Sequence, residues 1–259
     1  MSLRFKIDAS LLFLAFVCVS QAAEPDLGQP TTNIVIGFVG GMVRHTNAIH
    51  SEVQLATRLL NDYPRGLQVR MLENRRGSEA RREILELLDA NHDGRLSDAE
   101  KSAARIVIYG HSWGASETVT LARKLGQEGI PVLLTIQVDS VAKLGENDRS
   151  IPANVAQAIN FYQRDGLLRG EPQIHAEDSS RTRILGNFRF AYQNRQVDCT
   201  GYPWYAQMFM KPHIEIESDP NVWDQVESLI RSKLPAASGA KPSRNAGADR
   251  ERIQVPPGS

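Results

Sequence analysis

A short β-branched run that leads into a Gly-x-Ser-x-Gly turn is the feature that most constrains how this chain can fold. Residues 105–115 read Arg-Ile-Val-Ile-Tyr-Gly-His-Ser-Trp-Gly-Ala, and a segment with helical character follows at 116–127. This order predicts a nucleophile elbow, a strained strand-to-helix turn that holds the Ser112 hydroxyl out of the sheet. Gly110 and Gly114 supply the small residues that such a turn needs, because a side chain at either position would collide with neighbouring backbone. The helix that follows directs its first N–H groups towards negative charge formed at the serine.

Apolar segments along the rest of the chain alternate between two patterns. Continuous apolar runs are typical of strands buried on both faces, whereas apolar residues three and four positions apart favour helices. The expected strands are 33–39, 66–72, 106–109, 131–138 and 182–190, and the expected helices are 51–60, 79–88, 116–127, 152–162 and 221–234. Strands that alternate with helices predict the α/β class, with a mostly parallel central sheet flanked by helices.

The two ends of the chain differ in composition from its centre. Residues 1–23 combine a basic start, an apolar run and small residues at the end, which predicts a secretory signal peptide and a secreted or periplasmic protein. An uncleaved anchor is the alternative, but the run is too short for a stable membrane span. Residues 24–235 are expected to form one domain, and 236–259 are rich in Ala, Ser, Gly, Pro and charge, which favours a disordered tail.

Charge gives no reason to expect a nucleic-acid partner. The 259 residues include 30 Lys plus Arg and 30 Asp plus Glu, so the formal net charge is zero. A balanced chain has no global field that would attract a polyanion.

A serine hydroxyl needs a base to take its proton. In α/β enzymes with this elbow the order along the chain is serine, acid, histidine, which leaves His175 and His213. His213 follows the last strand-like region and precedes the closing helix, so we expect it to reach the upper edge of the sheet from a loop. His175 lies in a polar segment and is expected at the surface.

The base in turn needs an acid that fixes its tautomer. Asp139 ends the strand after the elbow, at the edge of the sheet where functional groups gather in open α/β folds. Asp139 could instead cap the loop that follows it. In that case the acid would come one strand later, from one of three residues: Glu177, Asp178 and Asp198.

An oxyanion hole would combine the N–H of Trp113 with one from the loop after residue 39. Gly40 and Gly41 offer unhindered amides at that point of the chain. The glycines could instead serve only to permit a tight turn.

With these features the chain resembles the α/β-hydrolase superfamily, most closely its lipase, esterase and thioesterase branches. The resemblance spans residues 33–234 and depends on the elbow, the glycine pair, Asp139 and His213. It departs from the usual pattern where Gly-Phe-Val-Gly-Gly replaces the common His-Gly after the early strand. The resemblance implies acyl-enzyme hydrolysis of an ester, thioester or amide on Ser112, without an organic cofactor. The acyl substrate is then a small molecule or lipid-like.

A second pattern, at residues 89–100, predicts a structural calcium site. The segment Asp-Ala-Asn-His-Asp-Gly-Arg-Leu-Ser-Asp-Ala-Glu matches the twelve-residue EF-hand loop, with Gly at its sixth position and a helix expected on each side, so 79–104 reads as an inserted helix-loop-helix. Side-chain oxygens and one backbone carbonyl, that of Arg95, would hold the ion; the candidate ligands are Asp89, Asn91, Asp93, Arg95, Ser97 and Glu100. The alternative is a polar loop with turn-forming residues.

The long segment between the candidate acid and base, 140–212, is expected to contribute a lid or cap. It holds two aromatic clusters, at 160–163 and 202–205, which either line an acyl pocket or pack the segment onto the domain. Three functions remain open from sequence: a serine hydrolase, a catalytically inactive calcium-dependent binding module, and a peptidase or acyltransferase that uses the same triad.

Overall fold

The computed structural model describes residues 31–235, so the expected signal peptide and the expected tail lie outside the described residues. In chain order the elements are β1 (Thr32–Val39), α1 (Ser51–Asp62), β2 (Leu67–Glu73), α2 (Gly77–Leu88), α3 (Asp98–Ser102), β3 (Ala104–His111), α4 (Trp113–Gln127), β4 (Val132–Val138), β5 (Ser150–Ile151), β6 (Val155–Tyr162), β7 (His175–Ala176), β8 (Arg183–Arg189), α5 (Trp204–Phe209), α6 (Lys211–Ser218) and α7 (Pro220–Arg231).

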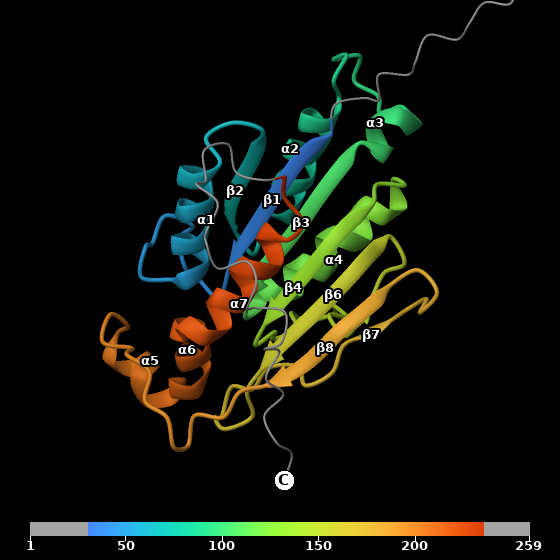
Figure 1. The fold of residues 1–259 in the computed structure, drawn as a ribbon. Coiled ribbons are helices and arrows are strands. Elements are labelled where there is room, and N and C mark those ends of the chain that lie inside the picture. The colour runs from blue at the N-terminus through green and yellow to red at the C-terminus, as the bar shows by residue number, and fades with distance from the viewer. Residues whose placement is uncertain (1–30, 236–259) are drawn as a thin grey trace, which may run out of the picture.

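Six strands form a central sheet in the order β2-β1-β3-β4-β6-β8, and every neighbouring pair is parallel. In Figure 1 the helices α1 and α7 lie over one face of this sheet, and α2 and α4 lie over the other. The α/β class predicted from the alternating segments is therefore confirmed. Strands β5 and β7 pair separately as a small parallel ribbon.

The core divides into two layers because successive side chains of a strand point to opposite faces of the sheet. On β1, Ile34, Ile36 and Phe38 join the cluster that packs under α2 and α4. Val35 belongs to the other cluster, under α1 and α7. Burial on both faces explains why the strand is almost continuously apolar in sequence.

The expected helix at 152–162 is wrong, because Val155–Tyr162 is strand β6, paired with β4 on one side and β8 on the other. Alanine and the amide residues in this segment have little strand propensity, but burial between two strands overrides propensity. Consequently the expected lid region, 140–212, includes two strands of the central sheet as well as loops and α5. Within residues 31–235, no helix is long and apolar enough to cross a membrane.

Candidate active site

The turn at Ser112 has the strained geometry of an elbow. Ser112 adopts φ 57° and ψ −124°, a conformation that L-residues rarely take, and it links β3 to α4. A Cβ on Gly110 would come 2.6 Å from the backbone of Gly114, and a Cβ on Gly114 would come 2.3 Å from the carbonyl oxygen of Phe38. Both glycines are therefore required by backbone packing. The Ser112 N–H donates to the Val138 carbonyl at 3.0 Å, which ties the turn to β4.

Three side chains from distant parts of the chain meet at the carboxyl edge of the sheet. The Ser112 Oγ lies 2.9 Å from His213 Nε2, and His213 Nδ1 lies 2.6 Å from Asp139 Oδ2. All three residues are buried, with Ser112 7% exposed and Asp139 fully buried. Since the carboxylate can only accept, His213 donates from Nδ1, and this leaves Nε2 free to accept the serine proton.

His213 reaches the serine from a helix, whereas the sequence suggested a loop. It lies in the first turn of α6, which begins at Lys211 and has Pro212 at a first-turn position. Proline favours this position because its fixed φ suits a helix start and its missing N–H would be unpaired there anyway. The helix fixes the imidazole more firmly than a loop would.

Asp139 is held by groups that the sequence did not reveal. Its Oδ1 accepts the backbone N–H of Gln163 at 3.0 Å, and its Oδ2 accepts Gln163 Nε2 at 2.7 Å. A Cβ on Gly170 would come 2.1 Å from Asp139 Oδ1, so only glycine fits there. Gln163 stood in one of the aromatic segments assigned to the lid, and no local pattern marks it or Gly170 as a partner of an acid on another strand.

The alternative acids and base lie elsewhere. Glu177 contacts Arg123 at the surface, and Asp178 and Asp198 each accept hydrogen bonds from residues two positions later. His175 is exposed on β7. Of the candidates considered, Asp139 and His213 are the ones in contact with each other.

Two of the residues expected to supply the oxyanion hole, Trp113 and Gly40, lie beside the serine. Trp113 begins α4, and within residues 31–235 neither its N–H nor that of Gly41 makes a hydrogen bond. Gly40 packs directly on the elbow, because a Cβ there would come 2.9 Å from the Ser112 Cβ. Gly41 has φ +46°, a left-handed conformation that glycine adopts without strain.

The aromatic residues of the two segments differ in burial: some pack into the domain, and others are exposed on α5. Phe161 is buried in the core and stacks on Phe188, and Tyr202 is buried with its ring edge-on to His50. Four residues of α5 are exposed instead: Trp204, Tyr205, Met208 and Phe209. Helix α5 packs against α6, and Figure 1 shows both at the carboxyl end of the sheet.

Behind the triad lies a buried polar cluster that the sequence gave no reason to expect. The His111 ring lies 4.5 Å from the His213 ring, and burial lowers the pKa of His111 to about 4, so it is neutral near pH 7. Burial raises the pKa of Glu217, but the facing imidazoles of His111 and His50 outweigh it and bring that pKa to about 2. Burial, together with repulsion from Glu217, raises the pKa of the neighbouring Glu52.

The EF-hand-like loop joins α2 to α3 in an ordered turn. Asp89 Oδ2 accepts the Gly94 N–H at 2.9 Å, and Gly94 has φ +78°, as the sixth position of such a loop requires. Ser97 caps α3, and the Glu100 carboxylate accepts from the Ser97 N–H and, across the loop, from the Ala90 N–H at 2.9 Å. The helix-loop-helix is present, with a second helix of five residues.

The donor set of the loop fits calcium in kind, because each side-chain donor is a hard oxygen. In this conformation the carboxylate oxygens of the loop lie too far apart to bind one ion together. In the part of the chain that the structure describes, the two places where at least three His, Cys, Asp or Glu ligand atoms lie within 4.8 Å of one another are elsewhere. Asp89, Asp93 and Glu100 would have to draw together around an ion.

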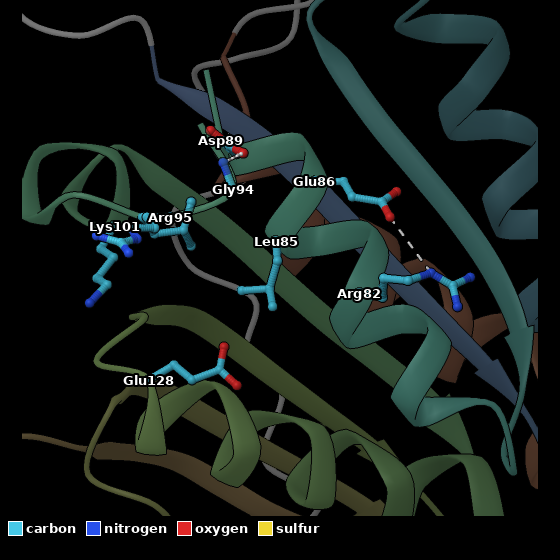
Figure 2. A pocket seen from close by; sticks show the side chains of 9 residues that line it. Arg82, Leu85, Glu86, Asp89, Gly94, Arg95, Lys101 and Glu128 are labelled. Carbon is cyan, nitrogen blue, oxygen red and sulfur yellow. Dashed lines mark hydrogen bonds and ion pairs between the residues drawn. The ribbon is translucent and has the colours of Figure 1, made fainter. Parts of the chain in front are cut away.

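A surface hollow of about 410 Å³ adjoins this loop. Figure 2 shows it between the loop, with Asp89 and Gly94, and Glu128 beyond the end of α4, with Leu85 of α2 pointing into it. None of the triad residues lines this hollow, so it does not belong to the candidate active site.

No protein-family model and no curated protein matches this chain. Among solved structures, a thermostable esterase from Pseudomonas putida is similar at 10% identity and a TM-score of 0.41, over 79% of this chain and 73% of that one. A mutant of esterase rPPE has 10% identity and a TM-score of 0.44, over 80% and 76%. A cutinase-like protein from Cryptococcus sp. has 12% identity and a TM-score of 0.42, over 80% and 97%. At these identities and TM-scores the likenesses say nothing about the substrate or mechanism of this chain.

Proposed function

We propose that this protein is an exported serine hydrolase that cleaves a carboxylic ester or thioester through an acyl-enzyme on Ser112. The observation that carries the proposal is the continuous chain of contacts from Ser112 Oγ through His213 to Asp139, at 2.9 and 2.6 Å. A strained serine backbone supports it further, because strain of this kind persists at functional sites and is costly elsewhere.

In the first half of the reaction His213 Nε2 takes the hydroxyl proton while Ser112 Oγ attacks the carbonyl carbon of the substrate. Asp139 stabilises the imidazolium that forms. The N–H of Trp113 and an N–H of the glycine loop would donate to the oxyanion of the tetrahedral intermediate. His213 then gives its proton to the leaving oxygen or sulfur, and the acyl group remains on Ser112. In the second half His213 activates a water, which releases the acid and restores the serine.

An apolar, lipid-like acyl group is the substrate we favour. Trp113 is partly exposed next to the nucleophile, and α5 exposes Trp204, Tyr205 and Met208 beside the helix that carries His213. Several large apolar side chains exposed in one region indicate a binding surface, whereas apolar residues exposed singly are common and need no explanation. These exposed apolar side chains would therefore favour an apolar acyl chain over a charged substrate.

A fluorophosphonate probe tests the proposal directly, because it labels only an activated serine. Wild-type protein should be labelled at Ser112, and Ser112→Ala should be unlabelled and lose about 10⁶-fold in kcat on its best ester. Ser180→Ala, an exposed serine far along the chain, is the matched control and should react like the wild type. A folded wild-type protein that stays unlabelled would instead favour a binding module, and turnover of amides or transfer to alcohols would favour a peptidase or an acyltransferase.

We further propose that the loop at 89–100 binds one structural calcium ion, with Arg95 contributing its carbonyl. The pattern of oxygen donors and the positive φ of Gly94 support this. The loop ends in α3, which β3 follows, and the eight residues of β3 span about 25 Å before Ser112, so the ion would act on stability and not on the reacting atoms. Metal analysis of the purified protein and a melt with and without EDTA test the site; no calcium together with an unchanged melt would exclude it.

A further inference from the structure

Four ionisable side chains lie buried behind the candidate triad, and within residues 31–235 no lysine or arginine forms an ion pair with them. His50 precedes α1 and Glu52 lies in its first turn, Glu217 comes from α6, and His111 ends β3. Glu52 is wholly buried, and the other three are less than one-tenth exposed. Within residues 31–235 the ion-pair partners of Glu217 are His50 and His111, and Glu52 has none.

Three of these side chains bring possible metal-ligand atoms close together. A nitrogen of His50 and carboxylate oxygens of Glu52 and Glu217 all lie within 4.8 Å of one another. His50 Nδ1 contacts one oxygen of Glu217, and the other oxygen of Glu217 lies 3.3 Å from His111 Nδ1. Ligands that share one ion at about 2.0–2.2 Å must lie within roughly 4.4 Å of each other, so a small inward shift of these side chains would bring the three atoms to ligand spacing.

Glu52 supplies an independent sign that a partner belongs in the cluster. Both of its carboxylate oxygens are buried and, among the residues that the structure describes, form no hydrogen bond. Leaving a buried polar group unpaired is costly, because its lost contacts with water are not replaced, and the cost is greater for a charged group. A divalent cation would bind these oxygens, and its two positive charges would equal the negative charge of two carboxylates, with both imidazoles neutral.

We propose that His50, Glu52 and Glu217 form a buried site for a first-row divalent transition metal of the zinc class. Imidazole nitrogen combined with carboxylate oxygen suits such ions, whereas calcium prefers oxygen alone and soft ions prefer thiolates. His111 lies beside the site and orients Glu217, as groups outside the ligand set commonly do. This site is separate from the calcium loop, and the proposal holds whether or not Ser112 is catalytic.

The proposed ligands come from the start of α1 and from the second turn of α6, the helix that carries His213. His111, which contacts Glu217, comes from the end of β3. Loss of the ion is therefore expected to loosen the contact between α6 and the start of α1.

The test uses the full chain, produced without a histidine tag, stripped with a chelator and then incubated with Zn²⁺ in millimolar Ca²⁺ to fill the EF-hand-like loop. We expect about one zinc per chain by mass spectrometric metal analysis and a higher melting temperature with zinc. Co²⁺ in its place should give visible absorption bands of nitrogen and oxygen ligation. A wild-type chain that holds no stoichiometric zinc and melts at the same temperature with and without it would overturn the proposal without recourse to any variant.

Two variants then locate the ion. Glu52→Gln and His50→Gln should each weaken zinc binding by more than the roughly 10- to 100-fold that loss of a supporting group costs. Glu215→Gln is the matched control, because Glu215 is equally buried on α6 but outside the cluster, and it should bind zinc like the wild type. If Glu52→Gln and His50→Gln both bind zinc as the wild type does, the ion is held elsewhere and this metal site is refuted.

Discussion

Replacement of Asp139 by asparagine gives the sharpest test of how the candidate triad is held together. The carboxylate accepts three hydrogen bonds, from the backbone and side-chain amides of Gln163 and from His213 Nδ1. An Asn side chain of the same shape has one oxygen and one NH₂ group, so whichever way the amide turns, an N–H is set against a donor. In one orientation His213 must change tautomer, which places a hydrogen on Nε2 where the serine proton should go.

The expected size of this effect follows from the role of the acid. Loss of the correct tautomer and of the charge that stabilises the imidazolium should lower kcat about 10⁴-fold, which is about 5 kcal/mol of transition-state stabilisation at 1.36 kcal/mol per decade. The donor-donor contact, in a fully buried site, should cost about 1–3 kcal/mol of folding free energy. Asp139→Asn should thus lose far more in catalysis than in stability.

The assay compares kcat/KM on a p-nitrophenyl ester, the rate of fluorophosphonate labelling and urea unfolding for four proteins: the wild type, Asp139→Asn, Asp219→Asn and Ser112→Ala. Asp219→Asn is the control, because Asp219 is equally buried and accepts hydrogen bonds from Arg195 and Tyr192 away from the triad. It should lose stability but keep its kcat. If Asp139→Asn retains activity within about tenfold of the wild type while Ser112→Ala is inactive, the carboxylate does not orient the base and the triad as described is refuted.

Three further outcomes are expected. Gly170→Ala should lower kcat with little change in KM, because the new Cβ would come 2.1 Å from Asp139 Oδ1 and displace the carboxylate; Gly201→Ala, whose Cβ meets only a flexible side chain at 3.2 Å, should not. Glu73→Gln should destabilise the protein at pH 7 but not below pH 2: although burial raises the pKa of Glu73, hydrogen bonds from His45 lower it to about 2, so its stabilisation exists above about pH 4.5 and is lost as the pH falls through 2. If urea unfolding still shows Glu73→Gln to be less stable than the wild type at pH 2, this explanation is contradicted. Treatment with EDTA followed by restoration of Zn²⁺ alone should leave the melting temperature lowered while kcat at 25 °C stays unchanged, and a parallel fall in both would show that the calcium loop acts on the chemistry.

Local sequence patterns predicted the parts of the fold that local physics determines. The apolar runs of β1, β3 and β4 can be recognised because both faces of each strand are buried. The elbow can be recognised because Gly110 and Gly114 are the residues its backbone contacts allow. The donor spacing at 89–100 specifies a loop, and the loop is formed.

Other parts depend on contacts between residues far apart in the chain, which no local pattern reports. Strand β6 carries alanine and asparagine at positions whose neighbours are supplied by β4 and β8, so its sequence alone favoured a helix. Gln163 binds Asp139 across 24 positions, and Glu217 meets His50 across 167. These partners become visible only when the sheet order is known.

Helix α6 shows how one short element couples the candidate active site to the cluster behind it. His213 and Glu217 are four positions apart and so lie on the same face of the helix. The first contacts Ser112 and Asp139, and the second contacts His111 and His50. A helix of eight residues has little stability of its own, so its position is set by these buried polar contacts and by the packing of Ile214 and Ile216. The distance from Ser112 to His213 therefore depends on the contacts of Glu217 with His50 and His111 as well as on the contacts within the candidate triad.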